Sequence, residues 1–220
     1  MIKPITLMIV GAQKAGTSSL LQYLGQHPDI CIHRQHEFVF FFSDFQYPKG
    51  YEHSFHEYFP HVMPGQAVLA KHAMLMYSPI AIERLYNHNP TTSLVVLLRN
   101  PIDRAYSAYW FARSRGWESV TTFEEAIRVE SDRIKDDGWL KWRNNAYLDN
   151  GKYAFHLERL QKYFGVEKMR IYLIEDLKMD PGKIFRQVFE MAGVNKDFMP
   201  DMTSKHNPST LARSEKFAQW

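Results

Sequence analysis

The stretch that decides the predicted fold is Met8–Leu24, which reads MIVGAQKAGTSSLLQYL. The apolar run Ile5–Val10 is typical of a buried strand, and Thr17–Leu24 has the pattern of a helix. Gly11 and Gly16 bound the short loop between them. A strand, a glycine-bounded loop and a helix in this order direct backbone N–H groups and a helix N-terminus towards an anion. The sequence therefore predicts an anion-binding turn near its amino end.

This loop differs informatively from the Walker A motif, G-x-x-x-x-G-K-[ST]. The two glycines have the required spacing, but Thr17 stands where the motif has lysine, and the only lysine of the loop is Lys14. Because a nucleoside triphosphate needs the displaced lysine, the loop predicts a shorter anionic group. The alternative is a strand–helix turn that binds no ligand. The dense cluster of glycine, lysine and hydroxyl residues makes this alternative less favoured. The residues expected to bind the anion are Lys14, Ala15, Gly16, Thr17 and Ser18.

Composition limits the class of protein. The chain has 220 residues, of which 45% are hydrophobic and 23% charged, as is ordinary for one globular domain. A net charge of +3 suits an anionic ligand but falls short of nucleic-acid binding. The single cysteine, Cys31, excludes an internal disulfide and suits a reducing compartment. No apolar run is long enough for a bilayer, and Met1 leaves no room for a signal peptide before the first predicted strand. We expect a cytoplasmic protein.

Alternating strand and helix patterns predict an α/β protein with a central parallel sheet flanked by helices, a P-loop-like nucleotide-binding fold. Strands are expected at Ile5–Val10, Ile30–Ile32, Ala67–Ala70, Ser93–Leu98 and Met169–Ile174. Helices are expected at about 17–26, 79–88, 101–113, 123–135, 151–164 and 181–193. The aromatic and histidine-rich residues Tyr47–Pro60 are expected to form an irregular or short-helical lid.

A second strand–loop–helix unit follows the pattern of the first. Arg99 ends the buried strand Ser93–Leu98, and Ser107 lies two turns into the next predicted helix. An arginine fork and a hydroxyl in these places can grip a second phosphate. For Arg104, on the same helix, we expect only an ion pair with an acidic neighbour. Together the two units predict a ligand that has phosphates at two separated places.

Three motifs give the chain a family resemblance: GAQKAGTSSL (11–20), HEFVFFFSD (36–44) and LLRNPIDRAYSAY (97–109). They resemble the sulfotransferases that use 3′-phosphoadenosine 5′-phosphosulfate (PAPS), above all the branch that acts on heparan sulfate and related carbohydrates. The likeness is to a bacterial-type, cytosolic member, and it extends from about Ile5 to Asn207. It implies that the first loop holds the 5′-phosphosulfate, and that Arg99 and Ser107 hold the 3′-phosphate.

The resemblance also implies the catalytic groups. Glu37, ahead of a phenylalanine-rich run, matches the glutamate that acts as general base on the acceptor. His33 and His36 are rival candidates for the base, since other sulfotransferases use histidine. Lys71 matches a lysine near the transferring group, with an ordinary surface lysine as the alternative. We therefore expect Glu37, Lys14 and Lys71 to be the catalytic residues.

Two further positions match the family less closely. Tyr153 matches a Gly-x-Tyr element near the 3′-phosphate, with a core tyrosine as the alternative. Ser204-Lys205 resembles the start of a Ser-Lys-Gly-Arg loop that closes over PAPS, but here Lys205 is followed by His206-Asn207. The cysteine pair that frames this loop in the Golgi enzymes is also missing. We expect Lys205 to contact a phosphate, and residues 1–220 to form one sulfotransferase domain with a shortened C-terminal element.

The predicted activity is sulfuryl transfer from PAPS to an acceptor hydroxyl, or as a second choice an amine, with no metal. A carbohydrate or glycoconjugate is the first choice of acceptor; a lipid, a polyketide or a small-molecule alcohol stays open. No nucleic-acid partner and no transmembrane segment are expected, and the oligomeric state is left open. The alternatives are a P-loop nucleotide kinase or NTPase, which the misplaced lysine disfavours, and a non-catalytic nucleotide-binding module, which would have no use for a base at Glu37.

Overall fold

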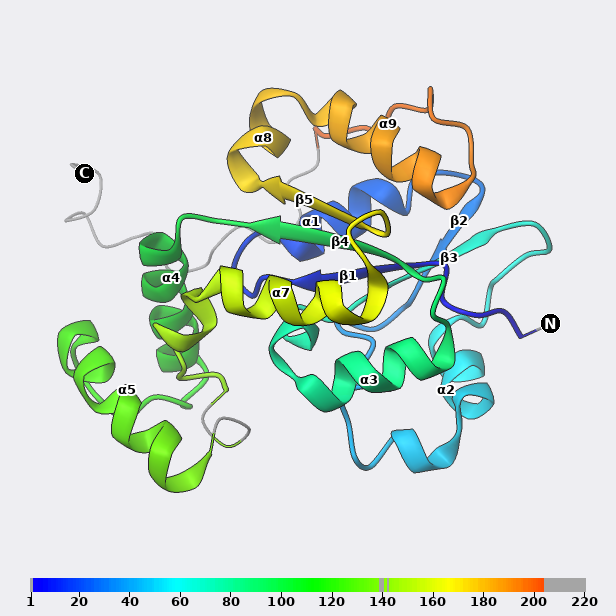
Figure 1. Cartoon of the computed structure of the whole chain (residues 1–220). Coiled ribbons are helices and arrows are strands. Elements are labelled where there is room, and N and C mark those ends of the chain that lie inside the picture. The colour runs from blue at the N-terminus through cyan, green and yellow to red at the C-terminus, as the bar shows by residue number, and fades with distance from the viewer. Residues whose placement is uncertain (1, 139–140, 142, 204–220) are drawn as a thin grey trace.

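The computed structural model describes residues 2–138, 141 and 143–203 (Figure 1). Its centre is a five-stranded sheet in the order β2-β3-β1-β4-β5, and every neighbouring pair is parallel. The predicted α/β class with a parallel sheet is therefore confirmed. The strands are β1 Leu7–Gly11, β2 Ile30–Ile32, β3 Ala67–Lys71, β4 Ser93–Leu98 and β5 Met169–Leu173.

Helices cover both faces of this sheet. The helices α1 and α9 lie on one face, where Tyr23 meets Phe185 edge-on, and α3 and α7 pack together on the other (Figure 1). The helices α4 and α5 lie beyond the carboxyl ends of the strands. The α-helices are α1 Thr17–Leu24, α2 Tyr51–Tyr58, α3 Pro79–His88, α4 Pro101–Ser114, α5 Phe123–Asp137, α7 Tyr153–Phe164, α8 Ile174–Met179 and α9 Pro181–Ala192. Short 3₁₀ turns occur at Tyr47–Lys49, Leu75–Tyr77 and Asp149–Gly151.

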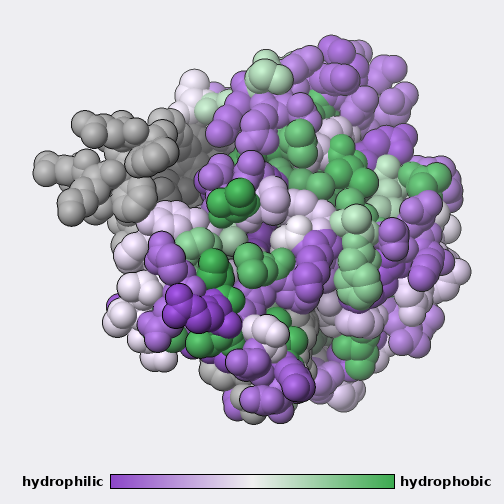
Figure 2. Space-filling view, turned by 60° about the vertical axis from the view of Figure 1, so that its left-hand side comes forward, coloured by the Kyte–Doolittle hydropathy of each residue, from purple (hydrophilic) through white to green (hydrophobic). Residues whose placement is uncertain are grey.

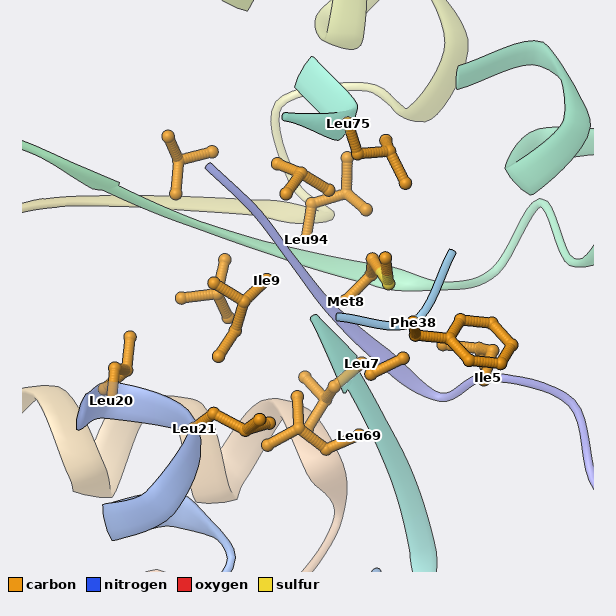
Figure 3. Close-up of a cluster of buried hydrophobic side chains, with 14 of the residues drawn as sticks. Ile5, Leu7, Met8, Ile9, Leu20, Leu21, Phe38, Leu69, Leu75 and Leu94 are labelled. Carbon is orange, nitrogen blue, oxygen red and sulfur yellow. The ribbon is translucent and has the colours of Figure 1, made fainter. Parts of the chain in front are cut away.

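The core is built on both sides of β1. All five residues of this strand are buried, as expected for a central parallel strand covered by helices on both faces. Successive side chains alternate between the faces, so Ile9 lies on the side of Leu20 and Leu21 of α1, and Met8 points the other way (Figure 3). Because β1 is packed on both faces, the loop that follows its carboxyl end starts from a defined position.

Most of the predicted elements are present, including the short-helical form expected for Tyr47–Pro60, and one helix of the structure was not predicted. The proposed lid is the 3₁₀ turn Tyr47–Lys49 followed by α2, and the Tyr51 hydroxyl donates to the Lys3 carbonyl at 2.7 Å. The other end of α2 lies beside the segment that follows β2, where the Arg34 N–H donates to the Tyr58 carbonyl at 3.0 Å and the Gln35 amide donates to the Glu57 carboxylate at 2.9 Å. The helix α8 was not predicted, because the apolar pattern of β5 runs into it without a turn signal.

The strand order places a topological switch point beside β1. The chain goes from β1 to β2 and β3 on one side, and then crosses to β4 and β5 on the other. In open parallel sheets, ligands bind at the carboxyl ends of the strands where the order reverses in this way. The loops that follow β1, β3 and β4 therefore meet at one edge.

Figure 2 shows hydrophobic patches among a mostly hydrophilic surface on the side where α4 and α5 lie.

Candidate active site

The loop after β1 has the backbone of an anion site. Lys14 has a φ of 68° and Gly16 a φ of 91°, both in the left-handed region. Such a conformation is costly for a lysine and is typical of functional turns. Gly16 is the N-cap of α1, and no side chain among the described residues caps this helix. The N-cap residue therefore offers no side-chain acceptor at this end of α1, where backbone N–H groups point towards the loop. Of the other predicted loop residues, Ala15 and Thr17 are buried.

The Lys14 side chain lies among aromatic and basic groups. Its ammonium nitrogen is 4.2 Å from the centre of the Phe111 ring on α4. The Arg99 guanidinium donates to the Lys14 carbonyl at 3.5 Å. Burial, followed by the charges of Arg99 and Arg115, lowers the pKa of Lys14 from its ordinary value. Three positive charges close together raise the local potential, which favours the binding of a polyanion.

Arg99 is held from its other side by α7. The Tyr153 hydroxyl donates to the Arg99 carbonyl at 2.9 Å, and burial raises the pKa of Tyr153. The structure therefore brings Lys14, Arg99 and Tyr153 into one connected group. Ser107 is half-buried on α4, two turns after Arg99. Among the described residues, no hydrogen bond joins Ser107 to Arg99.

A second group links the loop to β3 and to the segment after β2. The Lys71 ammonium donates to Ser18 Oγ at 3.0 Å and to Glu37 Oε1 at 2.9 Å. The second carboxylate oxygen of Glu37 accepts the Ala73 N–H at 3.0 Å. The Phe38 N–H donates to the Lys71 carbonyl at 2.8 Å, which places Glu37 beside the end of β3. The two carboxylate oxygens are thereby oriented by two donors.

The side chains of Lys71 and Glu37 differ sharply in burial. The Lys71 side chain is fully buried, whereas a quarter of the Glu37 side chain is exposed. Burial lowers the pKa of Lys71, and the adjacent Glu37 carboxylate opposes this shift. A buried ammonium next to a partly exposed carboxylate orients that carboxylate while leaving it accessible to a ligand.

The two histidines near Glu37 have different environments. His33 is buried, and its Nε2 accepts the Lys71 backbone N–H at 3.1 Å. Burial and the Lys71 charge lower the pKa of His33 to about 4, so it is neutral at pH 7. The His36 side chain is 71% exposed, and its Nε2 lies 4.0 Å from Glu37 Oε1. Burial, and then the Lys71 charge, lower the pKa of His36, with Glu37 opposing. Of the two rivals for the base, only His36 reaches solvent at the site.

A pocket of about 360 Å³ opens beside the Ser18–Lys71 contact. Its lining is mainly polar: Ser18, Leu21, Gln22, Arg34, Gln35, His36 and Lys71. These residues come from α1, from the segment after β2 and from the end of β3. A ligand seated there lies against the catalytic candidates Lys71 and His36 and meets amide, guanidinium and imidazole groups that can bind hydroxyls.

The prediction that Arg104 forms an ion pair with an acidic neighbour was wrong. This side chain is fully buried, and its guanidinium donates to the Tyr147 carbonyl. Among the described residues no carboxylate pairs with it, and its Nε and Nη1 atoms have no partner. The reason is that α4 turns Arg104 towards the backbone of the segment before α7 and not towards solvent. The predicted phosphate contact of Lys205 lies outside the described residues.

The sequence patterns did not predict several features of the site. The Ala73 N–H is invisible to any side-chain pattern. Gln22 and Arg34 belong to the pocket, although Arg34 stands in the polar run that precedes Glu37. Phe111 follows Ser107 by four residues, and this helical spacing puts both on one face of α4. That spacing was the available signal for a contact between α4 and the loop.

A model of the family described as the sulfotransferase domain matches residues 4–213 of the chain. The match covers most of the chain, so the chain belongs to the sulfotransferase family and is an enzyme of that class. Membership implies PAPS as the sulfate donor. The predicted family resemblance and enzyme class are thus confirmed. No helix among the described residues combines the length and apolar character needed to cross a membrane.

Similar proteins include enzymes that modify polysaccharides. Human bifunctional heparan sulfate N-deacetylase/N-sulfotransferase 1 is 30% identical over 200 residues, which cover 86% of this chain and 22% of the relative. Mouse heparan sulfate glucosamine 3-O-sulfotransferase 3B1 is 28% identical, with coverage of 90% and 47%. The chain therefore spans about a fifth and just under half of the length of these two relatives.

Solved structures show the same fold. A sulfotransferase from Alicyclobacillus acidocaldarius has a TM-score of 0.79 and 30% identity, covering 94% of this chain and 88% of its own. The mouse sulfotransferase SULT7A1, complexed with PAP, has a TM-score of 0.54 and 16% identity, with coverage of 88% and 60%. At that identity the second likeness concerns the fold alone.

Proposed function

We propose that this protein transfers the sulfuryl group of PAPS to a hydroxyl group of a carbohydrate or glycoconjugate. An amine is the second choice of acceptor group. The observation on which this proposal rests is the Ser18–Lys71–Glu37 chain of hydrogen bonds, which joins the anion-binding loop to a carboxylate and of which Ser18 and Lys71 line a polar pocket. A nucleotide-binding module would need the loop but not the oriented carboxylate.

Two groups of residues would bind the phosphates of the donor PAPS. The loop residues Lys14 to Ser18 and the N-terminus of α1 would bind the 5′-phosphosulfate. Arg99 and Ser107 would bind the 3′-phosphate, with Tyr153 fixing the Arg99 backbone. The left-handed Lys14 and Gly16 and the helix N-terminus at Gly16 support the first assignment, because left-handed turns that lead into a helix N-terminus are typical of anion sites.

In the proposed reaction, the acceptor oxygen attacks the sulfur atom of PAPS. The bond between sulfur and the oxygen of the 5′-phosphate breaks, and PAP leaves with the electron pair. Glu37 takes the proton of the acceptor hydroxyl as the new S–O bond forms. Lys14 offsets the charge that develops on the leaving phosphate, and Lys71 stabilises the sulfuryl oxygens while orienting Glu37. At the end of the step the proton is on Glu37, the sulfuryl group is on the acceptor oxygen and the electron pair is on PAP.

The choice of a carbohydrate rests on the pocket. Two glutamines, an arginine and a histidine line it, and Leu21 is its one apolar member. Such a lining binds hydroxyl groups and gives little to a lipid tail or a polyketide chain. The heparan sulfate enzymes among the relatives point the same way. The proposal includes a cytoplasmic location, one domain over residues 1–220 and a phosphate contact from Lys205.

The first prediction concerns the nucleotide that binds. With Lys14 inside the loop and Thr17 after Gly16, PAP should bind in the absence of magnesium, and ATP should bind about 10- to 100-fold more weakly, because it lacks a 3′-phosphate. Isothermal titration calorimetry with both nucleotides, with and without EDTA, measures this. Tight ATP binding that requires magnesium would instead favour the kinase or NTPase alternative.

The second prediction concerns Arg99. The Arg99→Ala variant should bind PAP about 10- to 100-fold more weakly, while its affinity for adenosine 5′-phosphosulfate, which lacks the 3′-phosphate, changes little. Competition binding with both nucleotides gives the comparison, and Arg128→Ala on the exposed face of α5 is the matched control. An equal loss for both nucleotides would mean that Arg99 supports the loop through the Lys14 carbonyl and does not bind the 3′-phosphate.

A further inference from the structure

The Lys14 ammonium is partnered by an aromatic ring and not by a carboxylate. Its Nζ lies 4.2 Å from the centre of the Phe111 ring. Two positive neighbours, Arg99 and Arg115, act on it electrostatically, and among the described residues no acidic side chain forms an ion pair with it. A lysine in such surroundings would ordinarily turn outwards into solvent, because its head group is strongly hydrated and repelled by both arginines.

The Phe111 ring is itself held in place. It is half-buried near the end of α4, and the Trp117 ring meets it edge-on, with 5.7 Å between the centres and 81° between the planes. The Arg115 guanidinium lies 5.4 Å from the same ring centre. The ring is therefore a fixed surface on which a cation can rest.

An aromatic face has a property that a carboxylate lacks at this place. Its quadrupole attracts a cation, but the ring has no net charge. A carboxylate beside Lys14 would neutralise it and repel an incoming phosphate. The ring keeps the ammonium in a defined position and leaves the positive potential of the site intact, which lowers the ordering cost when an anion binds.

We propose that Phe111 is a positioning residue for Lys14, whose aromatic face holds the lysine ammonium at the mouth of the anion loop in both the free and the nucleotide-bound enzyme. This inference rests on the proposed function, in which Lys14 binds the 5′-phosphate. It adds a residue of α4, outside the loop, to the machinery that binds and activates the donor.

Replacing the ring tests the proposal. The Phe111→Leu variant removes the quadrupole and keeps an apolar side chain, whereas Phe111→Tyr keeps the ring. Calorimetry with PAP should show about three- to tenfold weaker binding for Phe111→Leu and a change within about twofold for Phe111→Tyr. Tighter PAP binding by Phe111→Leu would mean that the ring competes with the nucleotide for Lys14, and it would overturn the proposal.

A double-mutant cycle separates positioning from simple packing. In a Lys14→Met background, Phe111→Leu should have no further effect on PAP affinity, because no ammonium is left to position. The same loss in both backgrounds would show a structural role and overturn the proposal. If Lys14→Met alone leaves PAP affinity unchanged, the proposed role of Lys14 in binding fails, which is a different result from an effect of Phe111 that is independent of Lys14.

The pH dependence of PAP binding gives a further readout. The basic groups that face Lys14 are Arg99, Arg115 and His36, and burial lowers the pKa of His36 from its ordinary value. The ring favours the charged ammonium, so its removal should lower the pKa of Lys14 further. The alkaline loss of PAP affinity should then begin at lower pH in Phe111→Leu than in the unmutated protein. Coincident alkaline profiles for the two proteins would contradict the proposed contact.

Discussion

The Glu37→Gln variant should bind PAPS almost normally and turn over about 10²–10⁴-fold more slowly, the usual contribution of a general base. Glutamine has nearly the size of glutamate, and its carbonyl oxygen can still accept from the Lys71 ammonium. Its NH₂ group faces the Ala73 N–H, so the hydrogen bond now made there at 3.0 Å is lost. The expected loss of stability is about 1 kcal/mol. Radiolabelled sulfuryl transfer at saturating donor, with donor affinity measured separately, gives both quantities.

Controls for this experiment come from the same region and from the far side of the molecule. Glu83→Gln, on the exposed face of α3, should leave turnover unchanged. His33→Ala and His36→Ala should cost far less than Glu37→Gln. Near-normal turnover of Glu37→Gln together with an inactive His36→Ala would assign the base to the exposed histidine, 4.0 Å from the carboxylate. If the unmutated protein sulfated no acceptor of any class, the binding-module alternative would be favoured.

The second large effect is expected for Lys71→Met. The methionine fills the buried space but removes both hydrogen bonds of the ammonium, to Ser18 and to Glu37. Loss of a preorganised charged donor at a reacting group costs about 10²–10³-fold in turnover, and we expect at least this reduction. Because a quarter of the Glu37 side chain reaches solvent, the loss of stability should stay below the about 3–5 kcal/mol of a fully buried pair.

The pH profile distinguishes this role of Lys71 from a packing role. Burial lowers the pKa of Lys71 from its ordinary value, so the enzyme should lose turnover on the alkaline side at a pH below that of an ordinary lysine. A group with a lowered pKa is charged below that pKa and neutral above it. The remaining activity of Lys71→Met should lose the part of this alkaline limb that is due to Lys71 and keep only the part due to Lys14, whose pKa is also lowered. An unchanged profile would show that another group titrates, and Lys162→Met on the exposed face of α7 serves as the matched control.

The sequence alone determined the elements that depend on short windows. The strand Ser93–Leu98 has the predicted bounds because five consecutive apolar residues follow Ser93 and end at Arg99, which leaves little choice. The caps at Ser78 and Thr122 are where a hydroxyl precedes a helical pattern, and both accept the expected backbone N–H. The loop Gly11–Gly16 is also local, since its glycines and lysine all lie within six residues. Family-specific motifs in these windows were enough to predict the fold and the enzyme class.

Only the tertiary structure decided which side chains meet. Glu37 and Lys71 are 34 residues apart, and their contact depends on β2 and β3 pairing in register. The position of Phe111 against Lys14 depends on the order β1-β4 in the sheet and on the direction in which α4 leaves β4. The burial of Arg104, with which no carboxylate of the described residues pairs, has the same origin. Propensity and periodicity act over one or two helical turns, whereas these contacts follow from strand order, which no short window of sequence specifies.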